Sequence, residues 1–384
     1  MSPNLLNARA SAAESSPIRD LLDQAARPGM ISLAGGLPDP MLFPLAELSM
    51  AAAEVVSLHG GRTLQYGVTR GEEVTRAALA GLIDGSNPAS VVVTTGAQQG
   101  LDLIARVLVE SGDVVVTGDP EYLGLVAVLR SYGARPHPVP QTDTGLDTER
   151  LERDLKSGLR PKACYVIPHF HNPTGVSISA SRRAHLHELS SRYGFMVIED
   201  DPYRWLYYDD RRPLDSQGDP ALTVRLWSTS KVLAPGLRIG ALDGPGWLVE
   251  AIIRQKQAAD LHTSTFSQAL VVAALGAPWF DAHVAQLRNR YRAKRDLFVG
   301  LLRGAFGDQL NFAVPDGGMF LWAEDKGGFD TAPWLVRSLE EGVCFVPGQA
   351  FAVDSDLRRF LRLSFVTATE ADLAAAVGRL AHAY

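Results

Sequence analysis

Short runs of β-branched residues alternate with helical patterns along most of this chain, and this alternation restricts its possible folds more than any other feature. Strands that alternate with helices build a mostly parallel sheet with helices on both faces. We therefore expect an α/β fold. The five clearest runs are Val91–Thr95, Val114–Thr117, Ala163–Ile167, Phe195–Glu199 and Val224–Trp227.

The length of the chain predicts more than one structural unit. A chain of 384 residues suits a large domain with a smaller companion. A long helical pattern from about Trp279 to Leu302 marks the change between them. We expect a large domain over 46–280, a small α+β domain over 281–384, and a segment over 1–45 that joins the small domain and the edge of the active site.

The first segment itself has two recognisable parts. The polar start is followed by an amphipathic pattern that predicts a short helix over Ser16–Ala26. The Gly- and Pro-rich stretch Ala34–Pro44 is then expected to be loop.

Composition excludes several classes of protein. Hydrophobic residues make up 46% of the chain and charged residues 21%, which is typical of a globular protein. No apolar run approaches the roughly 20 residues that a membrane helix needs, and no signal-peptide pattern is present, so we expect a cytoplasmic protein without a membrane partner. The net charge of −6 is spread along the chain, which argues against nucleic acid as a partner.

Three features that could carry chemistry have a plainer interpretation. The densest basic stretch, Arg288 to Arg295, is expected to be a solvated helix face. Cys164 and Cys344 lie in apolar contexts without metal-ligand spacing, so both are expected to pack. His169 and His171 have no third ligand beside them, so no metal site is expected.

Ligands of parallel sheets gather beyond the carboxyl ends of the strands, so the residues after each run are the candidates. The run Val91–Thr95 leads into Gly96-Ala97-Gln98-Gln99-Gly100 and then a helix. Free N–H groups at such a turn suit a phosphate, although the turn alone is more typical of an ordinary strand-to-helix connection. It contains neither GxGxxG nor GK[ST], so it does not indicate a nicotinamide or ATP site.

Three other strand ends carry unusual residues. Glu199-Asp200-Asp201 are either solvated loop or the charged partner of a ligand, because a carboxylate beside a ring nitrogen keeps that nitrogen protonated. Ser228-Thr229-Ser230-Lys231, with Arg238 seven positions after the lysine, offer a nucleophilic amine, hydroxyls and a cation for a phosphate dianion. The stretch His169–Gly175 contains turn residues, and its Asn172 is either functional or merely the cap of the following helix.

The ordered set of motifs is far more specific than any one of them. It consists of TTGAQQG, DPEY, HNPTG, EDDPY, STSK followed by PGLRIG, and RLSF. In this set the chain resembles the class I/II aminotransferases, pyridoxal-5′-phosphate (PLP) enzymes of fold type I, from about Ser32 to the C-terminus. ISLAGGLPDP, the QYG at Gln65–Gly67 and PDGGMFLW at Pro315–Trp322 resemble the branch of 2-aminoadipate, kynurenine and multisubstrate aromatic aminotransferases.

The resemblance implies PLP as the cofactor and a role for each matching residue. Lys231 matches the catalytic lysine that holds PLP as a Schiff base, and Asp200 matches the acid paired with the pyridine nitrogen. Tyr203 and Asn172 match the pair that bonds the phenolic oxygen, and Tyr122 matches the aromatic residue stacked on the ring. The residues implied to hold the phosphate are Gly96, Ala97, Gln98, Ser228, Ser230 and Arg238.

The resemblance also implies substrate and subunit contacts. Arg362 matches the arginine that binds the substrate α-carboxylate, with Gly36 and Asn172 nearby. Tyr66 resembles the tyrosine that reaches the phosphate of the neighbouring subunit, which implies a homodimer with shared active sites. The implied reaction moves an amino group between an L-amino acid and a 2-oxo acid by a ping-pong mechanism.

Alternatives stay open at this point. A lyase, oxidase, decarboxylase or acyl-CoA condensing enzyme would use much the same pocket. Related domains also follow a winged-helix module in some bacterial transcription factors, but no such module precedes Ser32 and the acidic balance is wrong for DNA. The expected donor is aromatic or long-chain, with 2-oxoglutarate or pyruvate as acceptor, or else a non-proteinogenic amino acid of secondary metabolism.

Overall fold

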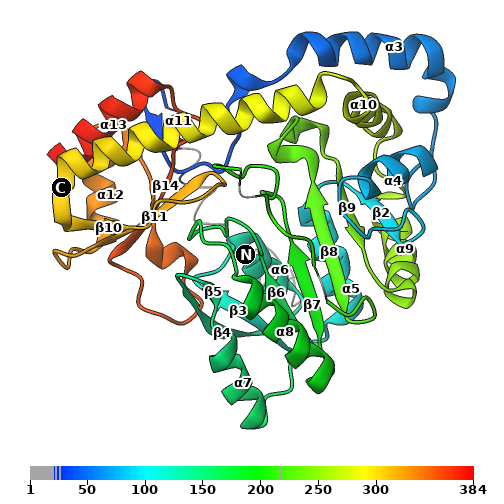
Figure 1. Ribbon diagram of the computed structural model, residues 1–384, viewed down its shortest axis with the longest axis horizontal. Helices are drawn as coiled ribbons and strands as arrows, with labels where there is room; N and C mark the ends of the chain where they lie inside the picture. Colours follow the sequence, from blue (N-terminus) through cyan, green and yellow to red (C-terminus); the bar gives the residue numbers. More distant parts are fainter. Residues whose placement is uncertain (1–20, 22–23, 26, 211, 217) are drawn as a thin grey trace, which may run out of the picture.

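An eight-stranded sheet forms the centre of the larger part of the molecule (Figure 1). The computed structural model describes residues 21, 24–25, 27–210, 212–216 and 218–384, so most of the helix expected over Ser16–Ala26 lies outside the described residues. The strand order is β2-β9-β8-β7-β6-β3-β4-β5. The strands are β2 Val91–Thr94, β3 Val114–Asp119, β4 Arg135–Thr142, β5 Gly145–Leu146, β6 Ala163–Val166, β7 Met196–Asp200, β8 Thr223–Ser228 and β9 Gly240–Asp243.

The predicted mostly parallel sheet is confirmed. Strands β8, β7, β6, β3 and β4 pair in parallel, while β9 runs antiparallel to both β2 and β8, and β5 runs antiparallel to β4. Each of the five predicted runs forms a strand whose ends differ from the prediction by no more than two residues. Strands β2, β6 and β7 are buried along their whole length, which is why their sequences show no alternation of apolar and polar residues.

Helices cover both faces of this sheet. Neighbouring strand residues point to opposite faces, so Val115 and Tyr165 belong to the main hydrophobic core, whereas Val116 and Cys164 belong to a second core beneath α7 and α8. Cys344 is buried too, which confirms that both cysteines pack. The helices of this part are α3 Leu45–Thr63, α4 Glu73–Ala80, α5 Ala97–Leu108, α6 Leu123–Ser131, α7 Thr148–Lys156, α8 Ala180–Tyr193, α9 Gly246–Asp260 and α10 Thr265–Leu275.

A smaller antiparallel sheet forms the second part. Its order is β10-β11-β14-β13, and the long helix α11 runs from the large part along this sheet with α13 beside it (Figure 1). Strand β1 pairs with β12, so the N-terminal segment is joined to the small part. The elements are β1 Ile31–Ser32, α11 Phe280–Phe306, β10 Leu310–Phe312, β11 Phe320–Asp325, α12 Thr331–Glu340, β12 Val343–Cys344, β13 Val346–Pro347, β14 Phe360–Ser364 and α13 Glu370–Ala383. The domain boundaries at residues 45 and 280 stay a prediction.

Short 3-10 turns complete the described chain. They are η1 Pro40–Leu42, η2 Thr229–Lys231, η3 Pro235–Leu237, η4 Gly307–Gln309 and η5 Gly348–Phe351. The prediction that Ala34–Pro44 is wholly loop is therefore wrong at η1, where the Asp39 side chain caps the turn by accepting a hydrogen bond from the Met41 N–H.

The basic stretch of α11 is only partly solvated. Arg290 and Arg292 are exposed, but Lys294 and Arg295 are buried, so the prediction of a solvated face is wrong for those two residues. Lys294 lies three residues after buried Tyr291, on the inward stripe of the helix. Its Nζ is 2.7 Å from the carboxylate of Asp39, so the buried charge is paired.

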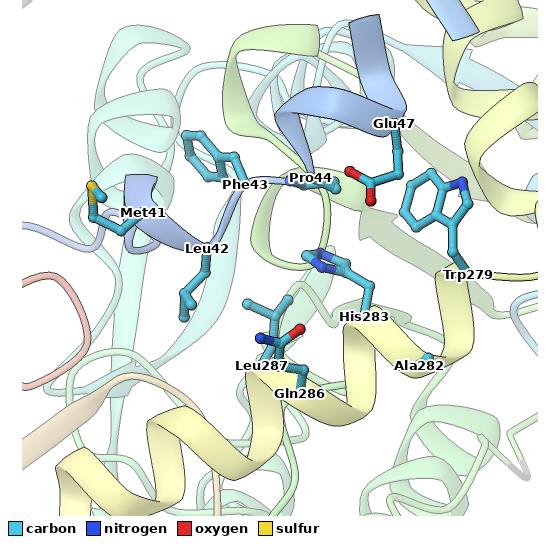
Figure 2. Close-up of a pocket in the computed structure, with 10 residues that line it drawn as sticks. All are labelled: Met41, Leu42, Phe43, Pro44, Glu47, Trp279, Ala282, His283, Gln286 and Leu287. Carbon is cyan, nitrogen blue, oxygen red and sulfur yellow. The ribbon is translucent and has the colours of Figure 1, made fainter. Parts of the chain in front are cut away.

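The N-terminal segment and the first turns of α11 enclose a hollow of about 350 Å³ (Figure 2). Its wall includes Phe43, Glu47, Trp279 and His283. Among the described residues, no single helix is both long enough and apolar enough to cross a membrane, and Thr265–Leu275 with Phe280–Gln309 pass the same test only as a pair bent by 85°.

Candidate active site

The segments that follow β2, β3, β6, β7 and β8 meet around a cavity of about 250 Å³. Because these strands all point the same way, their carboxyl ends lie at one edge of the sheet. The cavity therefore brings together most of the residues singled out from the sequence. Those that line it are Ala97, Gln98, Tyr122, Asp200, Tyr203, Ser228, Ser230, Lys231 and Arg238.

Lys231 ends the turn η2 that follows β8. Its Nζ donates a hydrogen bond to the carbonyl oxygen of Gly36 at 2.7 Å and stands 5.9 Å from the centre of the Tyr203 ring. Burial lowers the pKa of Lys231 to about 8, and the cations of Arg362 and Arg238 add to this effect. A lysine with this pKa is readily deprotonated near neutral pH, so it can act as a nucleophile and as a base.

The backbone around Lys231 is fixed from two sides. The Ser228 hydroxyl accepts a hydrogen bond from the Ser230 N–H at 3.1 Å, which caps η2. On the other side, His283 of α11 lies 2.9 Å from the carbonyl oxygen of Val232 through its Nε2. The lysine thus sits on a short segment with little freedom to move.

Asp200 faces the cavity from the end of β7. Its Oδ2 accepts a hydrogen bond from the Tyr165 hydroxyl at 2.9 Å, whereas its Oδ1 is buried and has no hydrogen-bond partner in the protein. Burial raises the pKa of Asp200 to about 7, and the nearby acids Asp201 and Glu121 add to the increase. A protonated ring nitrogen placed against Oδ1 supplies the missing donor and favours the ionised carboxylate. The residue therefore fits the partner of the PLP ring nitrogen.

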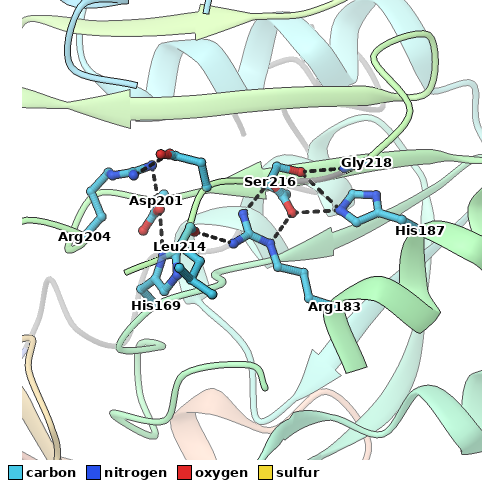
Figure 3. A network of polar contacts seen from close by, with 10 residues as sticks. His169, Arg183, His187, Asp201, Arg204, Leu214, Ser216 and Gly218 are labelled. Carbon is cyan, nitrogen blue, oxygen red and sulfur yellow. Dashed lines mark hydrogen bonds and ion pairs between the residues drawn. The ribbon is translucent and has the colours of Figure 1, made fainter. Parts of the chain in front are cut away.

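The two acids beside Asp200 pair with basic side chains (Figure 3), as expected when neighbouring strand residues point to opposite faces of the sheet. Burial alone would raise the pKa of Glu199, but hydrogen bonds from His187 and Arg183 outweigh it and hold that pKa below its ordinary value. Asp201 Oδ2 lies 2.8 Å from His169 and 3.5 Å from Arg204. Asp200 is thus left to face the cavity.

Sequence reasoning missed these supporting partners. Strand alternation was the available signal, because it puts Glu199 and Asp201 on the face away from Asp200. His169 pairs with Asp201, and His171 contacts Thr174 and Glu121, so each histidine has a non-metal partner. No group of three or more possible metal ligands occurs in the described part of the chain.

Backbone N–H groups, hydroxyls and a guanidinium converge at one end of the cavity. Gly96 has φ +79°, a backbone conformation that favours glycine, and a Cβ there would lie 2.4 Å from Nη2 of Arg238. Arg238 donates to the Thr95 carbonyl at 3.2 Å. Helix α5 begins at Ala97, so its first N–H groups face the same space as Ser228 and Ser230. This set fits a phosphate dianion.

Tyr122 and Tyr203 line the remaining space, and Asn172 lies behind Tyr203 as its hydrogen-bond partner. The Tyr122 hydroxyl donates to Oε1 of Gln98 at 3.1 Å, and burial raises the pKa of Tyr122 to about 12. Burial also raises the pKa of Tyr203, although a hydrogen bond with Asn172 acts in the opposite direction. The interpretation of Asn172 as a helix cap is wrong, because α8 begins at Ala180 and its cap is Ser179.

Arg362 reaches the site from β14 of the small part. Its guanidinium lies between the rings of Phe320, at 4.3 Å, and Phe351, at 4.8 Å. One Nη donates to Oδ1 of Asn172 at 2.7 Å, the other donates to the Ala34 carbonyl, and the buried Nε has no partner in the protein. Burial lowers the pKa of Arg362 to about 10, so the group stays cationic at neutral pH.

Two predicted residues, Gly36 and Tyr66, do not line the cavity. The Gly36 carbonyl accepts a hydrogen bond from Lys231, and a Cβ at Gly36 would lie 2.9 Å from the Phe320 ring, which is also the ring beside Arg362. Tyr66 is 78% exposed and packs edge-on against His262 at 5.8 Å, outside the cavity of its own chain. No contact among the described residues thus accounts for a role of Tyr66 at the phosphate.

The pKa of Asp200 predicts how stability depends on pH in the cofactor-free protein. Because the folded-state pKa of about 7 exceeds the ordinary 3.8, the folded protein binds the proton more tightly than the unfolded chain. The stabilisation that the protonated Asp200 carboxyl provides is complete at low pH, and it is lost as the pH rises through about 7. Asp200→Asn removes this dependence of stability on pH, because the amide does not titrate. Between pH 5 and pH 8 the free energy of unfolding of wild type should therefore fall by about 2–3 kcal/mol relative to that of the variant.

Urea unfolding of the cofactor-free proteins at both pH values checks this expectation. Asp308→Asn, at an exposed carboxylate, is the matched control and should keep the wild-type slope. Parallel curves for Asp200→Asn and wild type would show that Asp200 is already ionised throughout this range.

A lysine amine and a buried carboxylate on one cavity, with groups that fit a phosphate at one end of it and at the carboxyl edge of a parallel sheet, define a PLP-dependent enzyme of fold type I. Comparison with known proteins agrees. The family described as Aminotransferase class I and II matches residues 29–380. The chain therefore belongs to the class I and II aminotransferases and is a PLP-dependent transaminase.

The relatives place the chain in one branch of that family. It is 37% identical to the 2-aminoadipate transaminase of Thermus thermophilus, over 96% of this chain and 94% of that protein. It is 34% identical to aromatic-amino-acid aminotransferase 1 of Thermococcus litoralis, over 96% and 91%. A crystal structure of Pyrococcus horikoshii kynurenine aminotransferase in complex with PMP superposes with a TM-score of 0.94, at 33% identity over 99% and 96% of the two chains. The chain thus belongs to the aromatic, aminoadipate and kynurenine branch.

Proposed function

We propose that this enzyme transfers the amino group of an aromatic or long-chain L-amino acid to 2-oxoglutarate or pyruvate by a ping-pong mechanism. The observation that carries the proposal is the placement of Lys231 and Asp200 on one cavity, with the Arg362 cation near enough to lower the pKa of Lys231. Relatives named for aromatic amino acids and for 2-aminoadipate support this class of donor.

The proposed mechanism assigns each chain group a task. Bound PLP supplies an electron sink for the α-carbon of the substrate. Asp200 would hold the ring nitrogen of PLP protonated through Oδ1, and the Lys231 amine would take up and return the proton of the substrate α-carbon. Arg362 binds the substrate α-carboxylate, which orients the bond to be broken towards Lys231.

The side-chain preference is proposed from the mouth of the cavity. Leu37 lines it and is 51% exposed, so an incoming substrate side chain meets an apolar group there. An apolar contact favours aromatic and long aliphatic side chains through the area that they bury.

A panel of single amino acids tests the proposed donor class. Each amino acid is mixed with the PLP enzyme, and conversion to the pyridoxamine form is followed by absorbance. We expect phenylalanine, tyrosine, kynurenine and 2-aminoadipate to react at least about tenfold faster than alanine or serine, as the burial of several more carbons permits. A non-proteinogenic donor, including a guanidino-bearing one, belongs in the same panel.

Two outcomes contradict the proposal. Steady turnover without a 2-oxo acid, or steady release of ammonia, would indicate a lyase, oxidase or decarboxylase. Rapid reaction of only the small amino acids would leave transamination intact but overturn the proposed donor class.

The proposed assembly is a homodimer in which Tyr66 completes the neighbouring site. The exposure of Tyr66 supports this, together with exposed apolar residues on and beside α3, namely Met50, Val56, Leu58 and Leu64. A cytoplasmic location also stays a prediction.

Subunit hybrids test the shared site. Tyr66→Phe removes one hydroxyl contact to the phosphate and should weaken PLP binding by about tenfold. A hybrid of Tyr66→Phe with Lys231→Ala has one site that keeps both Lys231 and Tyr66, so at limiting PLP the mixture should be more active than the sum of its parents. Activity equal to that sum would place Tyr66 outside the neighbouring site.

A further inference from the structure

The carboxylate of Asp119 accepts four hydrogen bonds from one short segment. Asp119 ends β3 of the large sheet and is buried. Its Oδ1 accepts from the Val353 N–H at 3.0 Å, and its Oδ2 accepts from the N–H groups of Asp354, at 3.0 Å, and Ser355, at 2.8 Å, and from the Ser355 hydroxyl at 2.8 Å. Bonds to an ionised acceptor are the stronger class. One side chain thus ties the large sheet to the segment between β13 and β14.

The residues that follow Asp119 connect the segment between β13 and β14 to the cofactor side of the cavity. The Glu121 N–H donates to the Phe351 carbonyl at 2.9 Å. The fully buried Glu121 carboxylate accepts hydrogen bonds from the N–H groups of Gly118, at 2.8 Å, and Tyr122, at 2.7 Å. Tyr122 lines the cavity, so the segment that Asp119 holds is joined directly to a wall of the site.

The other end of the same segment reaches Arg362. Phe351 lies in η5, and its ring centre is 4.8 Å from the guanidinium carbon of Arg362. Trp322 packs edge-on against the Phe351 ring at 5.8 Å, which limits where that ring can lie. A shift of residues 351–355 relative to the large sheet therefore moves the Phe351 ring against which the Arg362 guanidinium packs.

We propose that Asp119 is a positioning residue for the substrate, which acts through residues 351–355 to hold Arg362 at a fixed distance from Tyr122 and Lys231. This inference rests on the proposed role of Arg362 in binding the substrate carboxylate. Substrate binding needs Arg362 and the cofactor face together, whereas cofactor binding needs only groups of the large part. Loss of the tie should therefore weaken carboxylate binding and leave cofactor binding intact.

Asp119→Asn tests this with little change of volume. The amide turns an N–H₂ group towards backbone N–H donors and removes the charge. The probe is 2-oxoglutarate added to the PLP form, which binds without reacting because it has no amino group, and its dissociation constant is measured by calorimetry. We expect an increase of about tenfold, within the range found for residues that act through an intermediate group. The dissociation constant of PLP should change by less than about twofold.

Two further variants separate positioning from a general structural role. Phe351→Leu removes the ring beside Arg362 and leaves the Asp119 bonds in place, so Asp119→Asn should have a smaller effect in the Phe351→Leu background than in wild type. Ser355→Ala removes one of the four bonds and should give a smaller increase, by about twofold to threefold. Ser355→Ala also serves as the test if Asp119→Asn does not fold.

The outcomes distinguish this inference from the proposed function. Tight binding of 2-oxoglutarate by folded, PLP-loaded Asp119→Asn overturns the positioning role, and so do fully additive effects in the double variant. Arg362→Ala is measured in parallel, and unchanged binding there overturns the proposed role of Arg362 itself. If wild type binds 3-phenylpropanoate but not 2-oxoglutarate, 2-oxoglutarate is excluded as the acceptor, and the same comparisons are made with 3-phenylpropanoate.

Discussion

Lys231→Ala is expected to abolish transamination, with the rate of amino-group transfer falling by about 10⁴-fold or more. The variant loses both the amine that bonds the cofactor and the base that moves the substrate proton, and proton transfer alone contributes about 10²–10⁴-fold. The remaining phosphate and ring contacts of the large part are untouched, so the variant should still bind PLP. Single-turnover absorbance measurements with a reactive donor give the rate directly.

Borohydride reduction provides an independent readout for Lys231. Wild type should retain a phosphopyridoxyl group on Lys231 after digestion and mass spectrometry, and Lys231→Ala should retain none. Lys156→Ala is the control, because Lys156 is exposed and pairs with Glu152 on the surface helix α7. Labelling of a different lysine in wild type would overturn the assignment of the whole site.

Arg362→Ala is expected to lower kcat/KM for the amino donor by about 10²–10³-fold. Truncating one partner of a buried charge pair costs about 2–5 kcal/mol, and here the lost partner is the proposed ligand of the substrate carboxylate. Arg362→Lys keeps the charge but loses the planar fork, so most of the loss should remain. The absorbance of the bound cofactor and its dissociation constant should stay close to wild type, because Arg362 comes from the small part.

Arg359→Ala is the matched control for Arg362. Arg359 immediately precedes the same strand, but its side chain is 54% exposed and pairs with Glu324. It should keep wild-type kinetics within about twofold, as exposed ion pairs contribute little. Equal losses in both variants would point to a general effect on β14 rather than to binding of the substrate.

The local pattern of the chain predicted the large sheet well. Runs such as Val91–Thr95 and Ala163–Ile167 are continuous and β-branched because the strands are buried on both faces. The end of a strand is a property of that local pattern, so the residues after it could be identified as site candidates before any contact was known. Lys231 and Asp200 meet at the cavity for this reason.

Contacts between distant segments could not be predicted in the same way. Tyr165 faces Asp200 from the neighbouring strand, and nothing in its own run distinguishes its hydroxyl from a packed aromatic ring. Lys294 belongs to a basic stretch typical of a solvated face, yet Asp39, 255 positions earlier, neutralises it in the interior. Both depend on which elements become neighbours after folding.

Periodicity and strand-end residues were sufficient to determine the α/β architecture and the order of the strand-end motifs, and they made Lys231 the candidate for the reactive amine. The tertiary structure decided which carboxylate of Glu199, Asp200 and Asp201 faces the cavity without a cation, and how Asp119 ties Arg362 to the cofactor side. The physical reason is the range of the forces concerned. Strand and helix preferences act over a few residues, whereas burial and charge pairing depend on groups brought together across hundreds of positions.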